Sequence, residues 1–168
     1  MAAGHNLKVC TGTNAGTEST GDASNWNLMS IDAYDSTGTD YQANPISVPS
    51  SGTNYSYERV LRVEFTGTFN AITNVLVWKS SGTLSDANLI LNAGKSATGV
   101  TPVNTVSSIA TSTIPLDSGT AIDITPSGGI SNDGDETDYL YTQLGVPDTV
   151  TTPGDIGTQT LTFQYDEA

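Results

Sequence analysis

The densest group of potential metal ligands lies at residues 131–139, SNDGDETDY. Asp133, Asp135 and Asp138 follow one another closely there, and Gly134 permits a tight bend between the first two. Calcium takes about six to eight oxygen ligands, so alternating carboxylates around a glycine suit it. The glycine comes too early for an EF-hand loop, and the distal bidentate glutamate is missing. We therefore treat these three aspartates as a candidate calcium site, with an acidic hairpin turn as the competing interpretation.

Few other residues offer catalytic chemistry. His5 is the only histidine and has no carboxylate or nucleophile at a recognisable motif spacing, and Cys10 is the only cysteine, which excludes an internal disulfide. Glu58 and Glu64 point the same way along a predicted strand, but Arg62 lies between them, so a charge lattice explains them better than a glycosidase carboxylate pair. Phosphate-binding, dinucleotide-binding and zinc-binding motifs are missing from the sequence. We expect a protein that is not an enzyme and carries no cofactor other than the candidate calcium.

The charge balance excludes several partner classes. Eighteen acidic residues against five basic ones give a net charge of −13, and the basic residues form no cluster. Binding to nucleic acid or to an anionic membrane through a basic face is therefore not expected. The first residues lack the apolar run of a signal peptide, and no stretch is long and apolar enough to span a bilayer. We expect synthesis in a cytoplasm.

Strand patterns recur along most of the chain, separated by clusters of Gly, Pro, Asn, Asp and Ser. The clearest is YERVLRVEF (57–65), where Leu61, Val63 and Phe65 share one face. No window shows helical periodicity. The pattern predicts an all-β fold, a single antiparallel β-sandwich, Ig-like or jelly-roll-like, with about eight strands. The predicted strands are 26–35, 57–65, 71–79, 87–94, 101–110, 120–125, 138–146 and 160–165.

Two of these strand pairs look like hairpins, and the N-terminus looks like an arm. We expect 57–65 to pair with 71–79, and 138–147 to pair with the last strand, whose Leu161, Phe163 and Tyr165 would face the core. Residues 1–25 show no periodicity beyond Leu7, Val9 and Cys10. We therefore predict an extended N-terminal arm at 1–25, lying on a neighbouring subunit, and a β-sandwich domain at 26–168.

Three stretches together, 56–86, 102–115 and 139–167, resemble small β-sandwich structural proteins from the virion modules of tailed bacteriophages. The resemblance implies a non-enzymatic virion protein, capsid decoration or cement-like or else tail-associated, and it implies no active-site residues. Its expected partners are the major capsid protein or other virion subunits, and further copies of itself in a homo-oligomer. Its expected location is the virion, after synthesis in the host cytoplasm.

Two alternatives stay open at this level. Within the same class, the chain could be a tail, collar or fibre component. From a different class, it could be a carbohydrate-binding or adhesive β-sandwich module, dependent on calcium through the 131–139 segment. Tyrosines at two-residue spacing, Tyr55 with Tyr57 and Tyr139 with Tyr141, share a face of their segments and would mark an interface if exposed.

Overall fold

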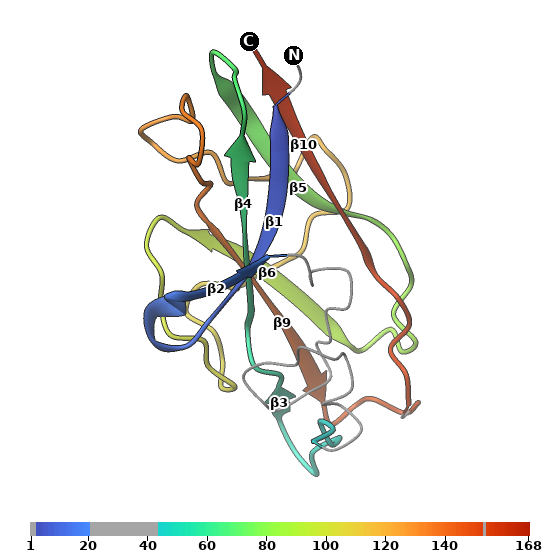
Figure 1. Ribbon diagram of the computed structural model, residues 1–168. Helices are drawn as coiled ribbons and strands as arrows, with labels where there is room; N and C mark the ends of the chain where they lie inside the picture. The colour runs from blue at the N-terminus through green and yellow to red at the C-terminus, as the bar shows by residue number, and fades with distance from the viewer. Residues whose placement is uncertain (1–2, 21–43, 153) are drawn as a thin grey trace.

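The computed structural model describes residues 3–20, 44–152 and 154–168, and this part of the chain contains β-strands, one short 3-10 turn and no α-helix (Figure 1). The prediction of an all-β fold is confirmed. The elements are β1 (Gly4–Thr11), η1 (Thr13–Ala15), β2 (Thr17–Thr20), β3 (Thr53–Tyr55), β4 (Arg59–Thr66), β5 (Ile72–Ser81), β6 (Ile90–Ser96), β7 (Ser112–Thr113), β8 (Ile122–Asp123), β9 (Tyr139–Pro147) and β10 (Thr160–Glu167).

The strands form two antiparallel sheets. The larger sheet has the order β2-β1-β4-β9-β6-β7, and β3 also pairs with β9. The smaller sheet has the order β10-β5-β8. The start of β1 and the end of β10 lie together at one end of the molecule (Figure 1), where the Ala3 amide donates to Glu167 Oε2 at 2.8 Å. The arrangement is that of a β-sandwich.

The main core fills the space between the two sheets, and the alternation in β4 determines which residues enter it. Leu61, Val63 and Phe65 are buried there, as predicted, whereas Arg62 and Glu64 lie on the opposite face. The inward residues of β10 also pack against this core, and the Tyr165 ring meets Phe65 edge-on with 4.9 Å between ring centroids. The predicted inner faces of both strands are therefore confirmed.

Both predicted hairpins are wrong. β4 pairs with β1 and β9, whereas β5 belongs to the smaller sheet, so residues 67–71 cross from one sheet to the other. β9 and β10 likewise lie in different sheets. Alternation shows which face of a strand is buried, but it does not show which strand lies beside it. In a β-sandwich, a short connection can return the chain to a neighbouring strand of the same sheet, or it can carry the chain to the other sheet.

The N-terminal segment also differs from the prediction. Residues 4–11 form β1, which lies between β2 and β4, and Val9 and Cys10 are buried. The Gly- and Asn-containing stretch after β1 is the turn of a hairpin, with Asn14 at φ 55°, so residues 4–20 are part of the sheet and not an arm. Residues 21–25 of the predicted arm and the predicted strand at 26–35 lie outside the described residues.

Deleting residues 1–11 is expected to abolish cooperative folding, because it removes an inner strand and uncovers the edge of β4. Thermal unfolding followed by circular dichroism should show no sharp transition for the truncated chain. Thr17→Ala, at an exposed position of β2, should stay within about 0.5 kcal/mol of the unmodified protein. A truncated chain that still melts sharply would show that β1 is dispensable.

Candidate functional site

Residues 97–111, here called the clamped loop, cover the outer face of the larger sheet. This segment contains the predicted strand 101–110, but the structure shows no regular strand there. Alternation along β9 directs Leu140 into the main core and Tyr141 the other way, where Tyr141 packs with Cys10, Val60 and Ala110 in a second apolar cluster. The loop supplies Ala110 to that cluster. It therefore covers apolar surface that would otherwise face water.

Side chains of β9 replace the strand partners that the loop lacks. The Tyr141 hydroxyl donates to the Val100 carbonyl at 2.9 Å and accepts from the Val100 amide at 2.6 Å. The Gln143 side chain donates to the Thr105 carbonyl at 2.8 Å and accepts from the Ser107 amide at 3.1 Å. Because Tyr141 and Gln143 are almost completely buried, these bonds are shielded from competing water.

A buried carboxylate holds the middle of the loop. Glu58, only 3% exposed, accepts hydrogen bonds from the Ser107 hydroxyl and, at 3.1 Å, from the Val103 amide. The Ser107 oxygen in turn accepts from the amides of Ile109 at 2.9 Å and Ala110 at 2.6 Å. Buried polar groups are costly unless they are paired, and here each donor has a nearby acceptor. The loop is irregular in backbone but fixed in place.

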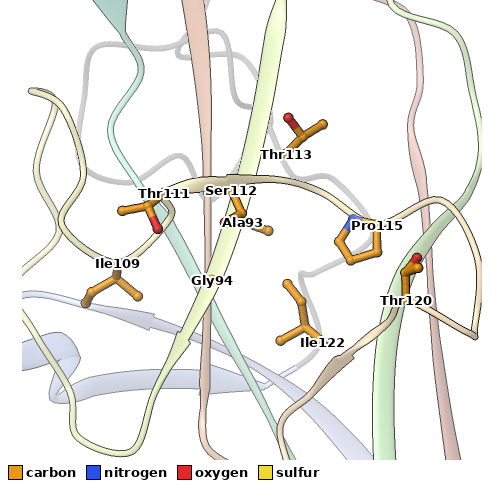
Figure 2. Close-up of a pocket in the computed structure, with 9 residues that line it drawn as sticks. All are labelled: Ala93, Gly94, Ile109, Thr111, Ser112, Thr113, Pro115, Thr120 and Ile122. Atoms are coloured by element: carbon orange, nitrogen blue, oxygen red, sulfur yellow. The ribbon is translucent and has the colours of Figure 1, made fainter.

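A pocket of about 400 Å³ opens beside the end of the clamped loop, where residues 109–110 pass over Gly94 of β6 before β7 pairs with β6 (Figure 2). The crossing needs Gly94, since a Cβ there would lie 1.9 Å from the Ile109 carbonyl oxygen. The lining is hydroxyl-bearing and apolar, with no ionisable side chain: Ala93, Gly94, Ile109, Thr111, Ser112, Thr113, Pro115, Thr120 and Ile122. Such a pocket offers contact area and neutral hydrogen bonds, not acid–base chemistry.

A cluster of two cations and three carboxylates lies on the outer face of β1 and β4: Lys8, Arg62, Glu18, Glu64 and Glu136. Lys8 Nζ lies 2.7 Å from Glu136, 3.0 Å from Glu64 and 3.2 Å from Glu18. Arg62 lies 2.7 Å from Glu136 and 3.2 Å from Glu18. Burial alone would lower the pKa of Lys8, but its hydrogen bonds to the carboxylates raise that pKa above its usual range. The cluster therefore fastens the β1–β2 hairpin to the sheet and keeps this lysine charged.

The predicted calcium ligands have separate partners. Asp133 accepts from the Gly67 amide at 2.8 Å, and Asp138 lies 3.4 Å from the Lys95 ammonium. Asp135 accepts from the two backbone amides at 131 and 132, which hold the pKa of its carboxyl below the usual range. Among the described residues, no group of three or more His, Cys, Asp and Glu side chains is placed to hold a metal ion. The structure thus does not bring Asp133, Asp135 and Asp138 together as a calcium site, because each carboxylate binds backbone amides or an ammonium group instead.

The remaining sequence candidates each lie against different groups. His5 is exposed and meets the Tyr165 ring edge-on at 5.9 Å between centroids. Burial raises the pKa of the Cys10 thiol to about 12, so it stays protonated near neutral pH and is a poor nucleophile. Glu58 lies just before β4 and Glu64 lies within it, and the first binds the clamped loop whereas the second binds Lys8.

One structural carboxylate was missed by the sequence analysis. Asp86 accepts from the backbone amides of Asn88 at 2.9 Å, Thr151 at 2.8 Å and Thr152 at 3.0 Å, and these bonds lower its pKa to about 2. The local signal was the Asp-Ala-Asn turn at 86–88, typical of an Asx turn. The partners from 151–152 are distant in sequence and left no signal.

Comparison with known proteins gives no match, since no family model, curated protein or solved structure is similar to this chain. Within the described residues, no helix has the length and apolar character needed to cross a membrane. The fold and the clamped loop together define a β-sandwich with a fixed surface loop.

Ser107→Ala is expected to release the clamped loop. It leaves the Ile109 and Ala110 amides and the buried Glu58 short of partners, which should cost about 1–3 kcal/mol of unfolding free energy. Hydrogen exchange across 100–110 should also become faster. The matched control is Ser108→Ala, an exposed neighbour expected to change stability by less than about 0.5 kcal/mol. Equal behaviour of the two variants would show that the Glu58–Ser107 contact does not hold the loop.

The stabilising contribution of Asp86 should be lost in acid. Its pKa is lower when folded than when unfolded, so its contribution to stability is complete above about pH 4 and is lost as the pH falls towards 2. Asp86→Asn should therefore lose most stability at neutral pH, and the difference should shrink towards pH 2. Urea unfolding at several pH values measures this. Asp148→Asn, whose carboxylate accepts one bond from the Gly52 amide, is the control and should show a smaller loss. A loss for Asp86→Asn that does not vary with pH would contradict the assignment.

Proposed function

We propose that this chain is a non-enzymatic virion structural protein that binds and reinforces an assembled capsid shell, with the clamped loop as its contact surface. The proposal is carried by a loop that is fixed from below and presents three exposed valines on its outer side. Val106 is 69% exposed, Val100 38% and Val103 36%, within seven residues of one another. Exposed apolar side chains are common singly, but three on one short segment are typical of an interaction site.

The fixed backbone makes the valines better binding groups. A flexible loop loses conformational entropy when it binds, and that loss offsets part of the gain from burying apolar surface. Here Tyr141 already holds Val100, and Glu58 already holds Val103. Binding can therefore bury the valine side chains at little further ordering cost, which supports a rigid docking role.

The charge indicates the chemistry of the partner. The net charge of −13 favours a shell surface that carries lysine or arginine around an apolar centre. The environments of Glu58, Asp86 and Cys10 support a structural role. The two carboxylates accept hydrogen bonds from backbone amides, and the thiol is protonated. The resemblance of 56–86, 102–115 and 139–167 to tailed-phage virion proteins supplies the particular assembly. One part of the expected mechanism changes. Residues 4–20 belong to the sheet, so we do not propose them as a docking arm.

The double substitution Val100→Ser/Val106→Ser is expected to weaken binding to shells by about tenfold or more, because it removes the apolar groups that binding would bury. Binding is measured by co-sedimentation with shells assembled from the major capsid protein of the same virus. Val48→Ser/Leu116→Ser is a closely matched control, since those residues are 38% and 63% exposed but lie outside the loop. The control should bind like the unmodified protein.

Two outcomes would count against this proposal. Equal binding of both double variants would remove the clamped loop from the interface. Failure of the unmodified protein to sediment with shells, together with its presence in tails of purified particles, would favour the tail or collar alternative. Shell binding that involves a basic partner should also weaken as salt is added.

A further inference from the structure

The edge of β10 that faces away from β5, here called its outer edge, has the features of a strand edge that can pair with another strand. β10 is the last strand of its sheet and, in the described part of the chain, pairs only with β5. Proteins usually protect such an edge with charged side chains, above all Lys, with Pro or with a bulge. Residues 160–167 contain no Lys, Arg or Pro, and their two charged residues, Asp166 and Glu167, lie at the end of the strand. The irregular positions lie in β5, where Ser80 is skipped and Asn74 adopts φ 51°. β10 itself runs as an uninterrupted strand of eight residues.

The core beside this edge is also incomplete. Leu161, Phe163 and Tyr165 point towards the main core but are only partly buried. On the adjacent strand, Val75 and Val77 are each 1% exposed. A further strand beside β10 would cover the inward side chains that are still partly in water and would pair the backbone groups that face away from β5.

We propose that the edge of β10 that faces away from β5 pairs antiparallel with β10 of a second copy of this chain, about a twofold axis at Phe163. This register places Phe163 opposite its own copy and Leu161 opposite Tyr165 on the inner face. On the outer face it places Thr162 opposite Gln164 and Thr160 opposite Asp166. Opposed residues fall on the same face, and no two like charges meet, which antiparallel pairing requires.

A dimer formed this way has a continuous six-stranded sheet with the order β8-β5-β10-β10-β5-β8. It is isologous, so the pairing closes on itself and uses up the exposed edge. Each chain carries a net charge of −13, so the two copies repel each other at long range. Added salt screens that repulsion, and the dimer should become stronger as ionic strength rises. The salt dependence is opposite in sign to that expected for binding to a basic shell.

Two double variants at the same positions test the register by sedimentation equilibrium of the full chain. Thr162→Glu/Gln164→Glu places glutamate opposite glutamate twice across the axis and should weaken the dimer by about tenfold or more. Thr162→Lys/Gln164→Glu places lysine opposite glutamate twice and should dimerise at least as tightly as the unmodified chain. Both variants remove the same exposed hydrogen bond from Thr162 to Ser80, so its loss cannot separate them.

Ser127→Glu/Thr149→Glu, at exposed positions outside β10, adds the same two charges as the weakened variant and should leave the dimer nearly unchanged at equal salt. A chain that stays monomeric at about 100 µM in 0.5 M salt would overturn the proposal, as would equal dissociation constants for the two β10 variants. The pairing does not rest on the shell-binding function, because it is measured with the purified chain alone. If the chain does not dimerise, the prediction for shell binding by the valine variants is unaffected. If shell binding fails, the prediction for the dimer is unaffected.

Discussion

Burial of β9 on both faces is the constraint on which the rest of the structure depends. Of its nine residues, only the first and the last are not fully buried. One face packs against the smaller sheet and the segments beside it, and the other lies under the clamped loop. β9 also pairs with β3, β4 and β6, so both of its edges are occupied. A strand covered in this way needs a protein segment over each face.

Covering the outer face with an irregular loop requires hydrogen-bond partners for that loop. A regular strand finds its partners in the sheet, but residues 97–111 lie across the sheet and cannot. Tyr141, Gln143 and Glu58 supply the partners from below, which explains polar side chains within an otherwise apolar layer. The same three contacts fix the loop and leave its valines to face outward. The side-chain contacts that hold the loop on the sheet thus also create the proposed docking surface.

The sequence predicted features that depend on local pattern and missed those that depend on distant partners. Alternation in 57–65 and 160–165 showed which faces are buried, because a strand with one apolar face repeats every second residue. It did not show that β4 and β5 lie in different sheets, or that β1 fits beside β4. The apolar residues of 101–110 suggested a strand, whereas the structure packs Ile109 and Ala110 against the Tyr141 cluster and leaves Val103 and Val106 exposed. The three aspartates at 133, 135 and 138 suggested calcium, but their nearest partners, Gly67, Lys95 and the 131–132 amides, could not be known from spacing.

The scarcity of cations links the two proposed contacts. The five basic residues offset few of the eighteen acidic ones. Lys8 and Arg62 pair with carboxylates in their cluster, and Lys95 lies near Asp138. Arg59 is buried, and Lys79 keeps its charge because its partners Gly82 and Gln159 are neutral, so the surface stays strongly acidic. Two copies in solution therefore meet with a repulsion that acts over about 8 Å at physiological salt. A basic shell surface would neutralise part of that charge on both copies at once. Pairing at β10 would then be favoured on the shell relative to free solution, because the pairing contacts stay the same while the repulsion against them falls.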